Sequence, residues 1–291
     1  MSVKILVTGA NGQLGQSIKT IQSSYPDWSF TYVDKEEMDL CNKEEVTALI
    51  NSIKPDFCMN TAAYTAVDKA EEDRDLAFKI NRDGVAYLCD ALAQVNGKLI
   101  HYSTDYVYGT PQSVPFKETD PTMPQGVYAE SKLAGDQLAL AHQVDTLVLR
   151  TSWVYSPFGH NFVKTMLRLA ESRSELSVVN DQIGSPTYAI DLADASLSII
   201  QQLIEKDASI FNEVYHCSNE GTCSWADFAR SIFKLSHLKV EVEGIPTSAY
   251  PTAASRPAYS VLDKSKLYRD FGITMPEWEE SLLKCLEQLN K

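Results

Sequence analysis

The fold is decided by the stretch Val3-Lys4-Ile5-Leu6-Val7-Thr8-Gly9-Ala10-Asn11-Gly12-Gln13-Leu14-Gly15. It begins with a short β-branched apolar run, which is typical of a parallel strand that is buried on both faces. Gly9, Gly12 and Gly15 then end the strand and open a helix. Glycine lets the backbone approach a pyrophosphate, and the free N–H groups and dipole of the new helix favour its negative charge. The stretch therefore predicts a dinucleotide site; the alternative is a tight turn that needs glycine for steric reasons alone.

The length and charge of the chain limit the possible classes of protein. At 291 residues it is long enough for one α/β domain with a substantial core and a smaller second lobe. Its net charge of −13 argues against broad nucleic-acid binding and against attachment to anionic lipid. No segment reaches the ~18 apolar residues of a membrane span, and the first strand begins too early for a signal peptide. We therefore expect a cytoplasmic protein.

The cysteines predict neither disulfides nor a metal site. None of them forms a Cys-x-x-Cys pair or has a histidine at zinc spacing. We expect reduced thiols, mostly in the core, at Cys41, Cys58, Cys89, Cys217, Cys223 and Cys285.

Apolar runs alternate with helical patterns along the chain. This order predicts an α/β fold with a Rossmann-like doubly wound parallel sheet, which a late strand at 214–217 rejoins. The NAD(P)-binding domain is predicted to cover residues 1–152 and about 186–217, and a smaller C-terminal substrate-binding lobe to cover about 153–185 and 218–291. The main strands are predicted at 3–7, 30–33, 56–60, 98–102 and 146–150.

An acidic residue ends the second predicted strand, where dinucleotide-binding domains hold the adenosine ribose. That residue, Asp34, would accept hydrogen bonds from the ribose of NAD. Lys35 follows it and would instead meet the 2′-phosphate of NADP, so NADH and NADPH both stay open. Asp34 is otherwise a plain turn residue at the end of a strand.

Three polar residues predict a reductase site. Tyr128 and Lys132 are four residues apart and lie on one face of a predicted helix. Thr104 follows a strand whose carboxyl end meets the same edge of the sheet. The Lys132 ammonium is expected to lower the pKa of Tyr128 from ~10, so that Tyr128 donates a proton while a cofactor supplies the hydride. The alternative is a surface tyrosine and a solvated lysine.

Two expectations concern the surroundings of this site. Asn81 is expected to precede a helix that Asn96-Gly97 ends. The loop from Gly109 to Gly126 carries four prolines and is expected to lie over the site.

Five motifs extend the argument beyond the glycine loop. They are Gly12 to Gly15, Asn60 to Glu71, Ser103 to Val107, Arg150 to Tyr155, and Tyr250 to Pro257. With them the sequence resembles the dTDP-4-dehydrorhamnose reductases, extended members of the short-chain dehydrogenases/reductases, over nearly its whole length. The resemblance implies NADPH- or NADH-dependent reduction of the 4-keto group of dTDP-4-dehydro-L-rhamnose, the last step of dTDP-L-rhamnose biosynthesis for bacterial polysaccharides.

The resemblance also implies roles for single residues. It places the sugar nucleotide on Val67, Thr104, Asp105, Trp153 and Arg256, where Trp153 offers a flat apolar surface and Arg256 a fork for a diphosphate. Trp153 is otherwise a core aromatic and Arg256 a surface charge. Lys132 is expected to hold the nicotinamide ribose, close to Tyr128. With the glycine loop, the remaining cofactor contacts are expected at Gly9, Asn11, Gly12, Gln13, Leu14, Gly15, Asp34, Asp39, Leu40, Ala62, Ala63 and Tyr64.

The sequence departs from this family at two places. Ser17 and Ile190 stand where some relatives bind a metal through glutamates at a dimer interface, so we expect no structural metal and either a monomer or a differently built homodimer. Tyr108-Gly109-Thr110 differs from the commoner motif, which leaves the conformation of the following loop open.

Two other functions stay open at this point. One is a nucleotide-sugar epimerase or 4,6-dehydratase of the same extended family, which would retain its NAD. The other is a non-catalytic NADP-binding regulatory subunit, as in the β subunit of methionine adenosyltransferase. The intact Thr104, Tyr128 and Lys132 favour the reductase.

Overall fold

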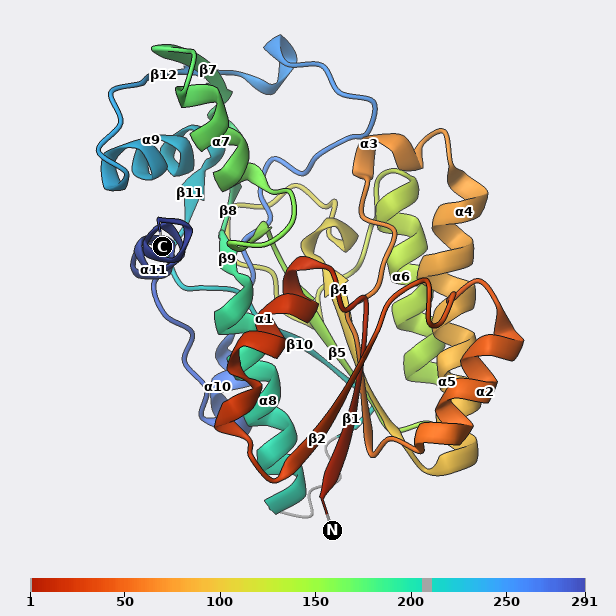
Figure 1. The fold of residues 1–291 in the computed structure, drawn as a ribbon. Coiled ribbons are helices and arrows are strands. Elements are labelled where there is room, and N and C mark those ends of the chain that lie inside the picture. The colour runs from red at the N-terminus through yellow and green to blue at the C-terminus, as the bar shows by residue number, and fades with distance from the viewer. Residues whose placement is uncertain (1, 206–210, 291) are drawn as a thin grey trace.

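The structure is a computed structural model that describes residues 2–205 and 211–290. Its central feature is a sheet of six parallel strands in the order β10-β5-β4-β3-β1-β2 (Figure 1). This confirms the predicted Rossmann-like fold and the return of the late strand to the sheet. The strands are β1 (Val3–Thr8), β2 (Trp28–Val33), β3 (Phe57–Asn60), β4 (Lys98–Thr104), β5 (Thr146–Thr151) and β10 (Glu213–His216).

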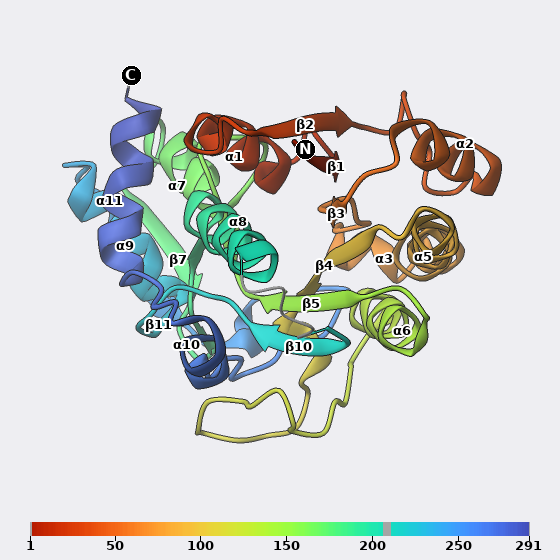
Figure 2. The same cartoon turned by 90° about the horizontal axis from the view of Figure 1, so that it is seen from below.

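Helices cover both faces of the sheet (Figure 2). Ile5 and Val7 of β1 contribute to the core on the side of α1 and α8, whereas Leu6 contributes to the core on the other side. This alternation explains why the strand is apolar throughout. The covering helices are α1 (Gln13–Ile21) and α8 (Ala189–Glu205) on one face, and α2 (Lys43–Ile53), α5 (Gly84–Val95) and α6 (Val127–Ala141) on the other.

The strand order positions the site. β1 pairs with β2 on one side and with β3 on the other, so the connection that follows β1 and the connection that follows β3 run in opposite directions along the sheet. A crevice forms at such a switch point, at the carboxyl ends of the strands. Thr8 and Asn60 are partners in the register there, and the Thr8 hydroxyl donates to the Asn60 side-chain oxygen at 2.7 Å.

A smaller group of elements packs around a core of its own. β7 (Glu175–Val179) pairs with β12 (Glu241–Ile245), and Phe228 and Trp278 lie in the core between these strands and the helices. A capping box of Ser224 and Asp227 begins α9. The other elements of this group are α7 (Phe162–Ala170), α9 (Trp225–Leu235), α11 (Trp278–Leu289), β6 (Val154–Tyr155), β8 (Ile183–Gly184), β9 (Thr187–Tyr188) and β11 (Cys223–Ser224).

The domain boundaries stay a prediction. Contacts cross them: α10 (Ser265–Phe271), for example, places Leu267 and Phe271 in the core of the main sheet although its residues belong to the predicted smaller lobe.

The predicted helix is α5, and Asn81 precedes it in the sequence, but Asn81 does not mark the start of the helical segment. The helical segment starts with α4 (Arg74–Phe78) and continues through a π-helical turn, Lys79–Asp83, into α5. The buried Asn81 side chain accepts from the Tyr64 N–H at 2.8 Å and donates to the Ser131 hydroxyl at 3.0 Å. An asparagine side chain often caps the start of a helix by bonding to nearby backbone, but the Asn81 side chain bonds to residues distant in the sequence instead. The end of α5 is as predicted, with Asn96 left-handed at φ 55°.

The loop 109–126 does not lie over the site, which also corrects a prediction. Phe116 stacks on Tyr108, and its N–H donates to the Val261 carbonyl at 2.8 Å. The apolar side chain of Phe116 is buried against Leu262, and the Glu118 carboxylate accepts from the His216 N–H at 3.1 Å, so this part of the loop is held beside β10. All six cysteines are free and five are buried. Within residues 2–205 and 211–290, no helix has the length and apolar character needed to cross a membrane.

Candidate functional site

A cavity of about 860 Å³ opens at the carboxyl ends of the central strands. Most of the predicted site residues meet in its wall, although they come from distant parts of the sequence. Those that line it are Gly9, Gly12, Gln13, Leu14, Asp34, Asp39, Leu40, Ala62, Ala63, Val67, Thr104, Asp105, Tyr128, Lys132 and Trp153.

The glycine turn forms a cradle at one end of the cavity. Gly9 has φ +62°, and a Cβ atom there would lie 2.8 Å from the backbone of Ala62. Gly15 does not line the wall but lets the helix pack, since its Cβ would lie 2.5 Å from the Gly9 carbonyl oxygen. The first N–H groups of α1 have no partner within the helix, and Gly12, Gln13 and Leu14 at its start line this end of the cavity.

Asp34 is tied to the glycine turn. Its carboxylate accepts from the Asn11 N–H and from the Lys35 N–H, both at 2.8 Å. Asn11 itself lies outside the cavity wall, whereas the exposed Lys35 side chain lies in it. The anchored carboxylate and the free ammonium therefore stand side by side at this end of the cavity.

Two more predicted residues lie away from the cavity wall. Tyr64 turns its hydroxyl to Asp73, to which it donates at 2.9 Å. The Arg256 fork donates to both carboxylate oxygens of Asp68, at 3.1 and 2.6 Å. Arg256 instead lines a second cavity of about 1020 Å³, and Trp225 lines both cavities.

Tyr128 lies on α6, and its ring meets that of Tyr106 edge to face with 5.8 Å between centroids. Burial raises the pKa of the Tyr128 phenol to about 12, and the Thr104 hydroxyl opposes that rise. The prediction that Lys132 lowers the pKa of Tyr128 is therefore wrong: burial raises this pKa, and the Lys132 ammonium is bonded elsewhere.

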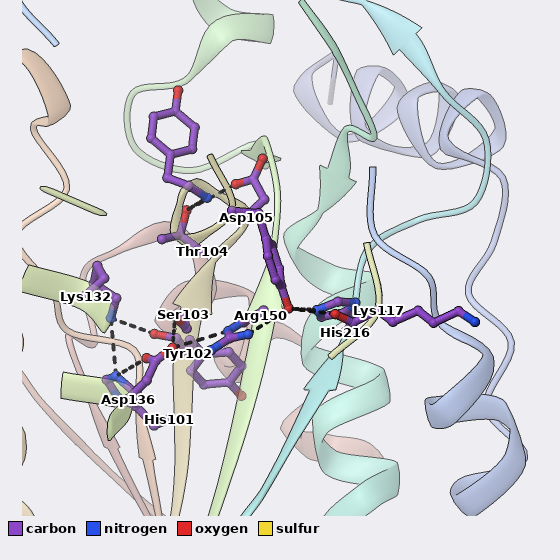
Figure 3. A network of polar contacts seen from close by, with 12 residues as sticks. His101, Tyr102, Ser103, Thr104, Asp105, Lys117, Lys132, Asp136, Arg150 and His216 are labelled. Atoms are coloured by element: carbon purple, nitrogen blue, oxygen red, sulfur yellow. Dashed lines mark hydrogen bonds and ion pairs between the residues drawn. The ribbon is translucent and has the colours of Figure 1, made fainter. Parts of the chain in front are cut away.

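The Lys132 side chain is 2% exposed and extends below Tyr128 toward β4. Its ammonium donates to the Tyr102 carbonyl at 2.7 Å and lies 3.4 Å from Nε2 of His101 (Figure 3). Burial lowers the pKa of Lys132 to about 8, and the charge of Asp136 opposes that fall.

Asp105 adds a buried carboxyl to the same wall. One oxygen accepts from the Thr104 hydroxyl at 3.1 Å, whereas Oδ2 is buried without a hydrogen-bond partner. Burial raises the pKa of this carboxyl to about 6. The Ser260 and Thr104 hydroxyls beside the carboxyl oppose this rise.

Trp153 and Trp225 form a stack in the wall of the same cavity. Their centroids are 3.6 Å apart and their planes differ by 7°. Trp153 has φ 47°, an uncommon backbone conformation for a bulky residue. Gly184 packs against its indole, since a Cβ there would lie 2.5 Å from the ring.

The sequence matches one family model over residues 3–291, the RmlD substrate binding domain. The chain belongs to this family. One RmlD-family relative is the dTDP-4-dehydrorhamnose reductase of Aggregatibacter actinomycetemcomitans, which is 40% identical over 285 residues, or 96% of this chain and 97% of the relative. The resemblance inferred from the motifs is thereby confirmed.

Solved structures agree with the RmlD assignment. The dTDP-4-dehydrorhamnose reductase of Bacillus anthracis, solved in complex with NADP, has a TM-score of 0.93 and 38% identity over 99% of this chain and 100% of that chain. UDP-glucose 4-epimerase of Thermus thermophilus, solved with NAD, has a TM-score of 0.83 but 20% identity over 99% of each chain, which shows a shared fold alone.

Several residues of this RmlD-family site escaped the sequence analysis. Asp136 lies four residues after Lys132, so helical spacing places it on the same face. His101 alternates with Ser103 along β4, which puts both on one side of the sheet. Trp225 has no local signal, because its partner Trp153 is distant in sequence. Among the described residues, no group of three or more His, Cys, Asp or Glu side chains is arranged to hold a metal ion.

Proposed function

We propose that this RmlD-family chain reduces the 4-keto group of dTDP-4-dehydro-L-rhamnose to give dTDP-L-rhamnose, with NADPH or NADH as hydride donor. The observation that carries the proposal is one cavity shared by the glycine turn at Gly9 and Gly12 and by Tyr128, Lys132 and Thr104. Family membership supports the reaction class, and the shared cavity supports its location.

The residues present fit a nicotinamide dinucleotide. The Gly9 cradle leaves no room for a side chain, and the small side chains of Ala62 and Ala63 line the wall beside it. Gly12 and Leu14, at the start of α1, would hold the pyrophosphate, and Lys132 the nicotinamide ribose. When bound, the coenzyme supplies a hydride.

Tyr128 would donate the proton that completes the reduction. A raised pKa keeps its phenol protonated at neutral pH, which is the form that a proton donor requires. Thr104 would hold the substrate carbonyl oxygen next to that phenol. The unpartnered oxygen of Asp105 would accept a hydrogen bond from a sugar hydroxyl.

The two cavities would share the sugar nucleotide. Trp153 and Val67 line the first cavity and would contact the deoxysugar. Trp225 lines both cavities, and Arg256 lines the second, so a diphosphate that crosses between them would meet the Arg256 fork. We also propose that the protein is cytoplasmic, that it is a monomer or a homodimer, that it holds no structural metal, and that it is divided into the two domains described above.

The test is to mix the protein with the dTDP-4-keto sugar and follow the loss of NADPH and NADH absorbance separately. We expect turnover and formation of dTDP-L-rhamnose. Tyr128→Phe should lower turnover by roughly 10²–10⁴-fold and leave NADP binding nearly intact, because one proton donor is lost and the cradle is kept. Tightly retained NAD would instead favour an epimerase or dehydratase, and NADP binding without turnover would favour a regulatory subunit.

A further inference from the structure

A buried cluster of charges lies behind the reductase site, between β4, β5 and α6 (Figure 3). Lys132 and Asp136 come from α6, His101 and Ser103 from β4, and Arg150 from β5. Each of these residues is at most 5% exposed. A charge buried this deeply is costly unless it is paired, so the pairing in the cluster has to be explained.

The Asp136 carboxylate interacts unequally with the two cations of the cluster, Arg150 and Lys132. Its Oδ2 accepts from the Ser103 hydroxyl at 2.7 Å and lies 3.4 Å from Arg150 Nε. Its Oδ1 is buried without a hydrogen-bond partner and lies 3.7 Å from Nε2 of His101, which in turn lies 3.4 Å from the Lys132 ammonium. One carboxylate oxygen is thus occupied, and the other faces the side on which Lys132 stands.

The Arg150 guanidinium is also held by a hydrogen bond to a residue other than Asp136. Its Nη1 donates to the Tyr108 hydroxyl at 2.7 Å. Because the Asp263 carbonyl accepts from His216 Nδ1 at 3.0 Å, neutral His216 is left with Nε2 as an acceptor for the Tyr108 hydroxyl at 2.7 Å. The guanidinium is held in this chain of bonds and stays beside Oδ2 of Asp136.

His101 adds no charge to the cluster. Burial and the nearby Lys132 lower its pKa well below the usual range, so the imidazole is neutral. Its Nδ1 faces the Asn60 amide at 3.2 Å, and the Asn60 oxygen accepts from Thr8. Two cations, Lys132 and Arg150, therefore share a single anion.

We propose that Asp136 is a positioning residue for the reduction: anchored by Ser103 and Arg150, it keeps Lys132 charged and aimed at the coenzyme ribose. The proposal rests on the function proposed above. Asp136 touches neither coenzyme nor sugar and acts through Lys132. Its unpartnered Oδ1 lies on the side of the cluster where His101 Nε2 and, beyond it, the Lys132 ammonium stand.

The expected pH dependence follows from the groups around Lys132. These are Tyr128 and Asp136 on α6, His101 and Asp105 on or next to β4, and Arg150 on β5. Asp136 raises the pKa of Lys132, and it also raises the pKa of Tyr128. Removing its charge lowers both pKa values, so both the ammonium and the protonated phenol are lost at lower pH.

The experiment compares Asp136→Asn with wild-type enzyme that reduces the dTDP-4-keto sugar. We expect the alkaline limb of kcat/KM to move toward acid by about one pH unit, with near-normal activity at pH ~6 and an about tenfold loss at pH ~8.5. Without sugar, the Kd for NADP, measured by tryptophan fluorescence, should rise several-fold at the higher pH only. Equal losses at both pH values would show a merely structural role.

Two further variants keep the test decisive. Asp136→Glu retains the charge and should keep the wild-type position of the alkaline limb even if turnover falls; a limb that moves as in Asp136→Asn would overturn the proposal. Tyr108→Phe removes a hydroxyl of the same network but no charge, and should lower the melting temperature without moving the limb. A wild-type protein without any turnover would refute the function instead, whereas these pH effects test Asp136 alone.

Discussion

Lys35 and Asp34 lie next to each other in the wall of the coenzyme cavity but have different partners. The Asp34 carboxylate is held by two backbone N–H groups, one of them from Asn11 in the glycine turn. Lys35 is exposed and has its ammonium available. Under the proposed function, Asp34 would shape the turn for either coenzyme, and Lys35 would supply the charge that distinguishes them.

Lys35→Gln should therefore change coenzyme preference. We expect the ratio of kcat/KM for NADPH to that for NADH to fall about tenfold, since one charge-assisted contact to the 2′-phosphate is lost. Initial rates with each coenzyme give the ratio. Asp34→Asn is the matched control, because it loosens the turn and should weaken both coenzymes alike. An unchanged ratio in Lys35→Gln would mean that another group reads the 2′-phosphate.

The buried Asp105 carboxyl changes the stability of the folded chain by an amount that depends on pH. Its pKa rises from 3.8 to about 6 on folding because the carboxyl is buried, so the folded chain binds the proton more tightly than the unfolded chain. The stability contributed by protonated Asp105 is therefore present below pH 3.8 and lost as the pH rises to about 6.

Asp105→Asn should remove this cost. We expect the variant to be more stable than wild type at pH ~8 by up to about 2–3 kcal/mol and nearly equal to it at pH ~4. Urea unfolding at the two pH values measures the difference. A stability gain of the same size at both would assign the effect to packing and not to charge.

At the scale of elements, the sequence predicts regular structure better than it predicts contacts between elements. The six strands and the helix starts at Gly12 and Ser224 follow from apolar periodicity and local capping, which are properties of neighbouring residues. Asn81 and the loop 109–126 escaped because their partners are distant: Asn81 bonds Tyr64 and Ser131, and Phe116 packs against Leu262. The cavity wall was largely predictable, whereas the Arg150 and Asp136 network behind it was not.

The short strand β8 illustrates how an element supports the site. Gly184 leaves space for the Trp153 indole, which stacks on Trp225 of α9. Gly184→Ala should push Trp153 out of this stack, because the new Cβ would lie 2.5 Å from the ring. We expect KM for the dTDP-sugar to rise about tenfold or more while the Kd for NADP stays constant.

Steady-state kinetics and a coenzyme titration on the same preparation separate these effects. Gly272→Ala serves as control: it lies at φ +66° with nothing within 4 Å, so it should lower stability by about 1 kcal/mol without changing KM. An unchanged KM in Gly184→Ala would show that the tryptophan stack does not touch the sugar.

At the scale of the whole molecule, one ion pair joins the two sides of the site. Asp68 lies on α3 (Val67–Ala70), close to the coenzyme cavity, and Arg256 lies in the loop after β12. The Asp68 side chain is 46% exposed and that of Arg256 is 22% exposed, so Asp68 can turn to water while Arg256 stays in place. A diphosphate would then replace Asp68 on the same fork.

If a diphosphate displaces Asp68 from Arg256, substitutions of these two residues should change KM for the dTDP-sugar in opposite directions. Arg256→Gln should raise KM for the dTDP-sugar roughly 10–100-fold, with kcat within a few-fold of wild type, because a charge-assisted fork to the diphosphate is lost. Asp68→Asn frees the fork and should leave KM unchanged or lower it several-fold, most clearly at low salt, where charge interactions are least screened. If Asp68 competes with the diphosphate for Arg256, removing its charge should favour substrate binding. An equal rise of KM in both variants would instead show that the ion pair holds the loop in place and does not compete with the substrate.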